Sequence, residues 1–327
     1  MSTHSPLVSV VIGVYNAGPE LLPTLRSILE QQDVEFEVIV VDDGSTDSTW
    51  ESLEFLATTD ARVRAIQQPE NQGLTKALIR GCEEVKGKYI ARQDIGDLSL
   101  PGRLKTQVDF LEQNPEVVLC SCWTRTVGPN DEFLGTNCPS DSSAVASRKL
   151  LDGFTGVTHH GATMFRTSTY RQASGYRSDF YFAQDLDLWY RLLRFGEQAY
   201  VPQVQYQIQV TPVCLSSRYR EQQLALAVII RKLAAGIKTE INTQELLWEA
   251  KQIRPNQSAF SRNLTNAAAG NYWIARMLTQ QADSRAFFYL VSAIRQQPLF
   301  AKAWLGFLSL GKAMLKRRAS SFFKRTV

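Results

Sequence analysis

Residues 36–47 read FEVIVVDDGSTD, and this stretch decides the fold. Its first half, residues 36–41, is rich in β-branched residues, which is typical of a strand buried on both faces. Two carboxylates and a glycine follow at once. Residues 46–57 then have the character of a helix, with Ser45 or Thr46 in position to cap it. A buried strand, a polar turn and a helix in this order predict one unit of an α/β sheet.

The same unit recurs on both sides of this stretch. Strands are predicted over residues 8–14, 63–66 and 89–90, and helices over residues 19–31 and 75–84. This alternation favours a mostly parallel, Rossmann-like sheet flanked by helices. Ligands of such sheets bind beyond the carboxyl ends of the strands. We therefore expect the functional site in the turns that follow the strands, at residues 14–16, 42–45, 68–71 and 92–97.

The composition is that of an ordinary globular protein. Among the 327 residues, 44% are hydrophobic and 21% are charged. The N-terminus lacks the layout of a signal peptide, and no stretch has the roughly eighteen apolar residues of a membrane-spanning helix. Five cysteines without a C-x-x-C pair favour reduced thiols. We therefore expect a cytoplasmic protein.

Several common functional motifs are absent. Gly13 and Gly18 are spaced like part of a P-loop, but Pro19-Glu20 replaces the residues that would meet phosphate and metal. No G-x-G-x-x-G follows the first strand, and no G-x-S-x-G is present. Only three histidines occur, which excludes a histidine-rich zinc site. The remaining candidates for chemistry are carboxylates.

Candidate carboxylates occur at three places in the sequence, two of them after predicted strands and one at the start of a predicted helix. Asp43 could accept a hydrogen bond from the N–H of a base, whereas we assign its neighbours 45–47 to helix capping. Asp94 and Asp97 lie in one turn and could share a divalent cation with a diphosphate, although a solvated turn has the same pattern. Asp185 begins a helix, whose dipole favours the ionised carboxylate. Asp187 is instead expected to pair with a basic residue one turn later, at position 191.

Taken together, these motifs resemble the family-2 glycosyltransferases of the GT-A fold. The matching stretches are residues 10–16, 40–47, 70–78, 87–94, 97, 100–101, 103–104, 160–166, 175–176 and the helix that begins at Asp185. Their order is far more specific than any one of them. The resemblance covers roughly the first two-thirds of the chain. It implies a GT-A domain over residues 1–217, followed by an α-helical C-terminal region over residues 218–327.

The resemblance implies transfer of a sugar from a nucleotide-diphosphate donor to an acceptor hydroxyl. A nucleic-acid partner is not expected, because the chain up to Asp283 carries a net negative charge. The residues expected to contact the donor are Gly13, Val14, Tyr15, Asp43, Lys76 and Asp94. Asp94 and Asp97 would hold a divalent metal, Mn²⁺ or Mg²⁺. Asp185 matches the family's general base, which takes the proton from the acceptor hydroxyl in a single inverting displacement. The acceptor would be a saccharide or a lipid-linked saccharide.

Three departures from the family pattern bear on the metal. Gly96 stands where the family usually has a carboxylate, Gln184 stands where an acid usually precedes the base, and Gln209 replaces a histidine. Metal dependence could therefore be altered, and a non-catalytic nucleotide-sugar-binding or scaffolding protein is the alternative function. A nucleotidyltransferase is disfavoured because residues 15–20 contain no basic residue. His159 and His160 are either structural or near the acceptor.

The C-terminal tail is strongly basic. Nine basic residues and no acidic residue follow Asp283, so the tail carries +9 and the preceding residues −5 of the net charge of +4. Residues 303–318 combine Trp, Phe and Leu with basic residues near their end. Two interpretations stay open: peripheral contact with an anionic membrane surface, which would suit a lipid-linked acceptor, or an ordinary packed helix with a basic end.

Overall fold

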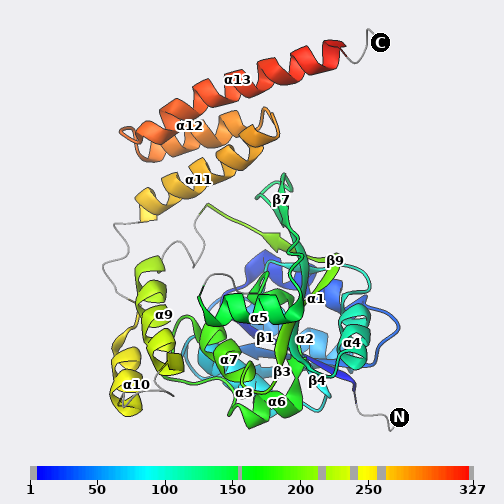
Figure 1. Ribbon diagram of the computed structural model, residues 1–327. Helices are drawn as coiled ribbons and strands as arrows, with labels where there is room; N and C mark the ends of the chain where they lie inside the picture. Colours follow the sequence, from blue (N-terminus) through cyan, green and yellow to red (C-terminus); the bar gives the residue numbers. More distant parts are fainter. Residues whose placement is uncertain (1–5, 154–156, 213–218, 236–241, 256–262, 324–327) are drawn as a thin grey trace. The chain divides into compact units, whose positions relative to one another are not determined.

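The computed structural model describes residues 6–153, 157–212, 219–235, 242–255 and 263–323 (Figure 1). The chain divides into two compact units. The first contains Met1–Thr124, Thr136–Ile208 and Gln222–Arg254, and the second contains Arg125–Gly135, Gln209–Glu221 and Pro255–Val327. The domain boundary expected at residue 217 falls outside the described residues.

The first four strands confirm the α/β class. The strands β1 (Val8–Val14), β2 (Phe36–Asp42), β3 (Val63–Gln67) and β4 (Tyr89–Arg92) lie in the order β3-β2-β1-β4. All three pairings among them are parallel. The connecting helices are α1 (Leu21–Leu29), α2 (Thr49–Thr59) and α3 (Leu74–Glu83). The β-branched residues of β1 and β2 are almost completely buried, as expected for strands covered on both faces.

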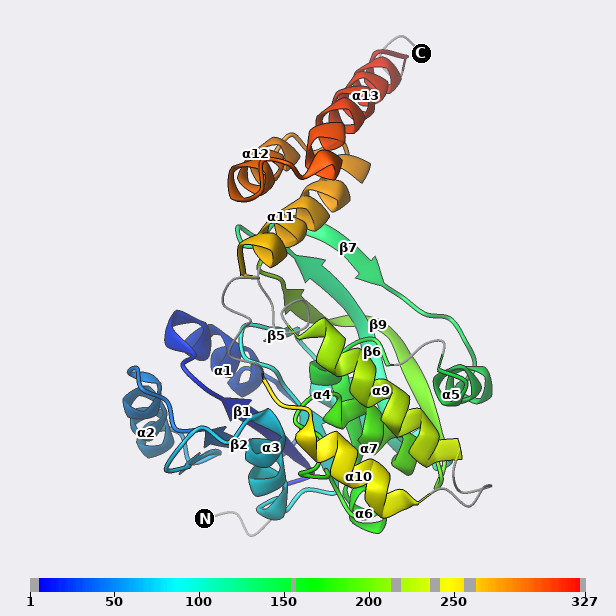
Figure 2. The same ribbon diagram turned by 90° about the vertical axis from the view of Figure 1, so that its left-hand side faces the viewer.

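Beyond β4 the sheet continues in the order β4-β8-β6-β9-β5, with β7 paired to β6. The pairings of β4 with β8, β8 with β6 and β9 with β5 are antiparallel. These strands are β5 (Leu98–Ser99), β6 (Val117–Val127), β7 (Phe133–Asn137), β8 (Thr163–Arg166) and β9 (Glu197–Gln209). The accompanying helices are α4 (Arg103–Gln113), α5 (Ser143–Leu151), α6 (Thr167–Gln172) and α7 (Gln184–Leu192) (Figure 2). Strand β4 is therefore the place where parallel pairing changes to antiparallel pairing.

Two further helices belong to the first unit. The helices α9 (Arg220–Ala235) and α10 (Thr243–Gln252) contribute Leu226, Ile230 and Leu246 to the apolar core that α3 and α7 also enter. Asn242 caps α10, since its side-chain oxygen accepts from the backbone N–H groups of residues 244 and 245. The helices α9 and α10 thus add to the apolar core of the unit that carries the sheet.

The second unit is built on three helices, α11 (Asn263–Gln280), α12 (Ala286–Gln296) and α13 (Ala301–Phe323). Short connections over residues 281–285 and 297–300 separate the three helices. The helices share a core with Leu134 of β7, to which Ile274, Leu290 and Leu310 contribute. Within the described part of the chain, no helix is long and apolar enough to cross a membrane.

The start of α2 differs from the prediction. The helix begins at Thr49 with Ser48 as its N-cap, rather than at residue 46. Asn16 explains the difference, because its backbone N–H donates to the Ser45 hydroxyl and its side-chain oxygen accepts from the Thr46 N–H. These long-range bonds hold residues 45 and 46 outside the helix. Asp47 does act at the helix end, where its carboxylate accepts from the Thr49 N–H at 3.0 Å.

Candidate active site

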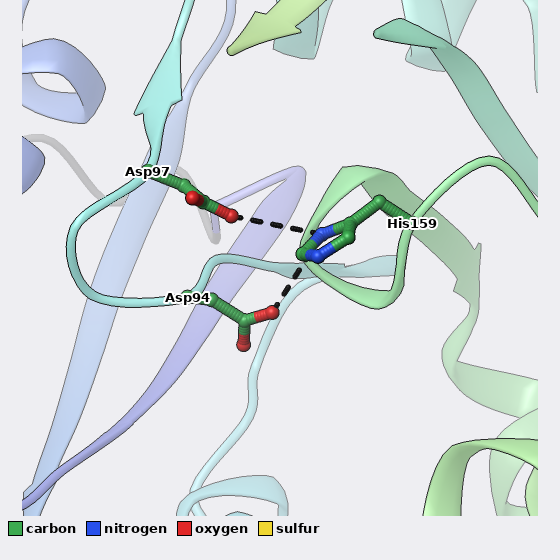
Figure 3. A group of neighbouring side chains, drawn as sticks. All are labelled: Asp94, Asp97 and His159. Carbon is green, nitrogen blue, oxygen red and sulfur yellow. Dashed lines mark ion pairs between the residues drawn. The ribbon is translucent and has the colours of Figure 1, made fainter. Parts of the chain in front are cut away.

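A cluster of Asp94, Asp97 and His159 lies at the carboxyl end of β4 (Figure 3). The two carboxylates occupy the turn after β4, and the imidazole lies just before β8. The antiparallel pairing of β4 with β8 brings these two turns together. The Nδ1 atom of His159 is 3.8 Å from Oδ2 of Asp94 and 3.6 Å from Oδ2 of Asp97. The predicted closeness of the two carboxylates is thus observed, and a histidine joins them.

The three atoms that face one another, two carboxylate oxygens and one imidazole nitrogen, are all hydrogen-bond acceptors rather than donors. The backbone N–H of Gly161 donates to Nδ1 of His159 at 3.2 Å, so this nitrogen is unprotonated, and a cation bound to it would replace this hydrogen bond. Burial, only partly offset by Asp94, lowers the pKa of His159 and keeps the ring neutral. Two carboxylate oxygens and an imidazole nitrogen that converge without a shared proton form a donor set for a cation.

Asp94 is held in its ionised form. Its Oδ1 atom accepts from the fully buried guanidinium of Arg92 at 2.7 Å. Burial by itself works to raise the pKa of Asp94, but the positive charge of Arg92, with a smaller contribution from Arg103, lowers it. Arg92 also donates to Nε2 of His160, whose pKa burial and Arg92 lower to about 3. His160 is therefore a neutral hydrogen-bonding group.

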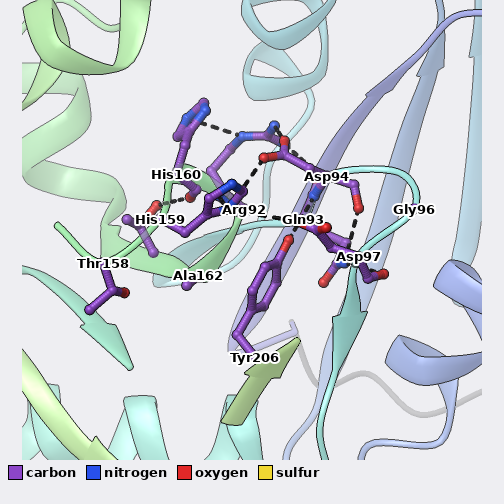
Figure 4. A network of polar contacts seen from close by, with 12 residues as sticks. Arg92, Gln93, Asp94, Gly96, Asp97, Thr158, His159, His160, Ala162 and Tyr206 are labelled. Atoms are coloured by element: carbon purple, nitrogen blue, oxygen red, sulfur yellow. Dashed lines mark hydrogen bonds and ion pairs between the residues drawn. The ribbon is translucent and has the colours of Figure 1, made fainter. Parts of the chain in front are cut away.

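Tyr206 supports the turn that carries Asp94 (Figure 4). The backbone N–H of Asp94 donates to the Tyr206 hydroxyl at 3.2 Å, and the Tyr206 ring stacks on His159 with 5.7 Å between centroids. A Cβ atom at Gly161 would lie only 2.0 Å from that hydroxyl, so position 161 accepts no side chain. One tyrosine therefore positions both a carboxylate and the imidazole.

Asp185 lies in the first turn of α7, as predicted, and is partly buried. Its Oδ1 atom accepts from the backbone N–H of Leu186 at 2.8 Å. Burial, together with the negative charge of Asp94, raises the pKa of Asp185 from 3.8 to about 6. The direction is opposite to the one expected from the helix dipole, because loss of solvent outweighs it. A carboxylate with this pKa is a competent proton acceptor near neutral pH.

Asp187 has the structural role expected of it. Its Oδ2 atom forms a buried ion pair with Arg191 at 2.5 Å, one turn along α7. Arg177 lies on its other carboxylate oxygen at 3.7 Å. Asp187 thus ties α7 to its surroundings, whereas Asp185 accepts from a backbone N–H of its own helix.

The residues expected to contact a donor lie around the ends of β1 and β2. Asp43 is buried, and its two carboxylate oxygens accept from the backbone N–H groups of Gln72 and Gly73 at 2.8 and 2.7 Å. Burial, partly offset by these bonds, raises the pKa of Asp43. Asp43 therefore fixes the loop before α3, a structural role that the sequence did not reveal; its contact with a donor stays a prediction.

The three residues at the end of β1 and just after it have different environments. Gly13 packs against α3, where an added Cβ atom would lie 2.8 Å from Leu74. Val14 is buried, and Tyr15 has 47% of its surface exposed. Of these three residues, Tyr15 is the one whose side chain is available to a ligand.

Lys76 lies in the first turn of α3, where its ammonium donates to the side-chain oxygen of Gln72 at 3.0 Å. It lines a cavity of about 150 Å³. The other lining residues are Gln72, Thr75, Ser178, Tyr181 and Arg254. The cavity has two cations and no carboxylate in its wall, which suits an anionic group.

The departures at positions 96 and 209 have physical explanations. Gly96 has a φ of +90°, and a Cβ atom there would lie 3.1 Å from the carboxylate of Glu20. An aspartate at this position would be strained and would face a like charge. Gln209 donates to the carbonyl of Gly128 at 2.6 Å, within the second unit. Gln184 is buried at the start of α7.

Comparison with known proteins agrees with this fold. EpsE of Bacillus subtilis (strain 168) is 35% identical over 198 residues, which cover 60% of this chain and 69% of EpsE. TuaG of the same organism is 34% identical over 111 residues, 34% of this chain and 44% of TuaG. The structure of S. aureus TarS in complex with UDP-GlcNAc superposes with a TM-score of 0.55, at 14% identity, over 88% of each chain.

The fold is that of the GT-A glycosyltransferases. The family model of Glycosyl transferase family 2 matches residues 9–172. The chain belongs to this family, and it is a glycosyltransferase.

Proposed function

We propose that the chain is an inverting glycosyltransferase in which Asp185 is the general base. The observation that carries the proposal is the environment of Asp185, which raises its pKa to about 6 at the start of α7, within electrostatic reach of Asp94. A base with a pKa just below neutral pH is largely ionised and still accepts a proton readily. The acceptor would be a saccharide or lipid-linked hydroxyl.

In the proposed reaction, the acceptor oxygen attacks the anomeric carbon of the donor sugar. Its proton passes to Asp185, a C–O bond forms, and the bond between the anomeric carbon and the donor diphosphate breaks. One displacement inverts the configuration at that carbon. The positive charges of Arg92 and Lys76 favour a site that receives an anionic diphosphate.

We propose Asp94, Asp97 and His159 as the ligands of a divalent metal. The three ligand atoms lie within 4.8 Å of one another, and their chemistry suits such an ion. A bound cation would neutralise charge on the departing diphosphate. An imidazole nitrogen favours Mn²⁺ over Mg²⁺, which prefers oxygen ligands. His159 would thereby supply the third ligand in place of the carboxylate that the family usually has at position 96. This favours a catalytic protein over the scaffolding alternative.

A nucleotide-diphosphate sugar should stabilise the protein against heat. With Mn²⁺ present and ligand at a hundredfold over Kd, the stabilisation is about 2.7 kcal/mol, enough to raise the Tm by several degrees. The panel would contain uridine, guanosine, cytidine and thymidine diphospho-sugars, including UDP-GlcNAc, the ligand in the TarS complex. Tyr15→Ala should reduce the shift, whereas Phe55→Ala, a similarly exposed aromatic change on α2, should not. No shift with any donor would contradict the proposed function.

His159→Ala should weaken Mn²⁺ binding at least tenfold, because it removes one of three protein ligands. Binding of Mn²⁺ alone can be followed by electron paramagnetic resonance, which counts the free ion without a turnover assay. Glu51→Gln, an exposed change on α2, is the matched control and should bind like the parent protein. Equal Mn²⁺ affinity in His159→Ala and the parent would remove His159 from the ligand set.

A further inference from the structure

The helix α13 carries two apolar stripes on different sides. One stripe packs into the core of the second unit and comprises Ala303, Phe307, Leu310 and Met314. The residues next to these, Trp304, Leu308 and Leu315, follow the same helical spacing but have 55%, 66% and 68% of their surfaces exposed. An ordinary surface helix has one apolar stripe, so the second stripe requires a separate explanation.

The second stripe is part of a larger surface that we call the outer aromatic face. It consists of Phe287 and Phe288 of α12 and Trp304, Leu305, Leu308 and Leu315 of α13, each of which is more than half exposed. The ring of Phe307 joins the two helices, with centroids 5.4 Å from Phe287 and 6.5 Å from Trp304. Phe307, at the edge of the packed stripe, thus connects exposed rings of both helices.

The charge around this face has one sign. Lys302, Lys312 and Lys316 are exposed on α13, and no acidic residue follows Asp283 in the sequence. Asp283 itself is paired with Arg285 at 2.6 Å. The outer aromatic face is therefore bordered by cations without carboxylates of its own helix.

We propose that the outer aromatic face binds the surface of an anionic lipid bilayer. Trp, Phe and Leu side chains enter the boundary between headgroups and acyl chains, while long lysine side chains reach the phosphates. A second copy of this chain fits less well, since a symmetric contact would bring the same lysines together. A protein partner also fits less well, because lysine is depleted at protein interfaces.

Vesicle sedimentation of the full chain tests the proposal. We expect at least tenfold stronger binding to vesicles of phosphatidylcholine with 30% phosphatidylglycerol than to phosphatidylcholine alone, and weaker binding as salt increases. The double variant Trp304→Ser with Leu308→Ser should lose at least tenfold in affinity. The double variant Lys312→Glu with Lys316→Glu should bind anionic vesicles more weakly, by at least fivefold in affinity for each lysine. The reason is that each basic residue near the surface contributes about fivefold to the affinity.

The matched control is Leu22→Ser with Phe55→Ser, which removes two similarly exposed apolar side chains from the first unit. It should bind vesicles like the parent protein. Circular dichroism and Tm identify variants that fail to fold; all three pairs change exposed residues and should pass. Equal binding by the control and the face variants, or no preference for anionic vesicles, would overturn the proposal. So would a dimer in sedimentation velocity that the Trp304 and Leu308 changes dissociate.

Discussion

Asp185→Asn should reduce kcat by about 10²–10⁴, because it removes the group proposed to accept the proton of the attacking hydroxyl. This loss corresponds to roughly 3–5 kcal/mol in the activation barrier. Asparagine has nearly the same shape and can still accept from the Leu186 N–H, so the local fold should persist. Turnover would be measured as release of nucleoside diphosphate, with the donor that stabilises the protein most.

Two measurements distinguish a catalytic loss from a binding loss. The donor-induced Tm shift should be the same in Asp185→Asn and in the parent. Asp179→Asn makes the same chemical change at a partly buried carboxylate before α7 and should keep kcat within a few-fold. Full activity in Asp185→Asn would disprove the assignment of the base. Donor binding without turnover in the parent would favour the scaffolding alternative.

The pH dependence of the parent enzyme follows from the same carboxylate. Only ionised Asp185 accepts a proton, so kcat/KM should rise with pH to an inflection near 6 and remain level above it. The free energy of unfolding depends on pH in the opposite direction to kcat/KM. Because the folded state binds this proton more tightly than the unfolded chain, stability falls as pH rises from about 4 to about 6. Asp185→Asn should therefore raise the Tm at pH 7 while it removes activity.

The parallel half of the fold and the position of Asp185 could be predicted because their signals are local. A run of β-branched residues predicts a buried strand wherever it occurs, and the segment around Asp185 combines an acid with helical apolar spacing. Asp94 and Asp97 are similarly close in the chain, so one turn brings them together. These predictions required no knowledge of long-range pairing.

His159 could not be predicted because its role depends on a long-range contact. It approaches Asp94 only because β8 pairs antiparallel with β4, and local periodicity does not encode which strands pair. The late start of α2 has the same kind of cause, since Asn16 holds Thr46 across a gap of 30 residues. The sequence of α13 indicated its apolar residues, but only the packing of Leu310 distinguishes the buried stripe from the exposed one.

Arg103→Met should lower the free energy of unfolding by about 3–5 kcal/mol, because it leaves several buried acceptors without a donor. Arg103 is completely buried. Its guanidinium donates to the carbonyls of Arg92 and Gly161 at 2.7 and 2.8 Å, and to the side chains of Gln93 and Ser99 at 3.0 and 2.8 Å. One side chain therefore joins the turn of Asp94 and Asp97 to the turn that follows His159.

The loss in the free energy of unfolding should exceed the loss from replacing an exposed arginine. Because Arg103 joins two turns of the site, its replacement should also affect metal binding. Arg148→Met removes an exposed arginine that pairs with Asp152 at 3.3 Å, and it should change stability by less than about 1 kcal/mol. Urea unfolding of both variants measures the difference.

Arg103→Lys should also be destabilised, since an ammonium cannot span acceptors on both turns. If Arg103 positions the site, Arg103→Lys should also bind Mn²⁺ more weakly at temperatures where it remains folded. Unchanged stability in Arg103→Met would mean that other contacts hold the two turns together.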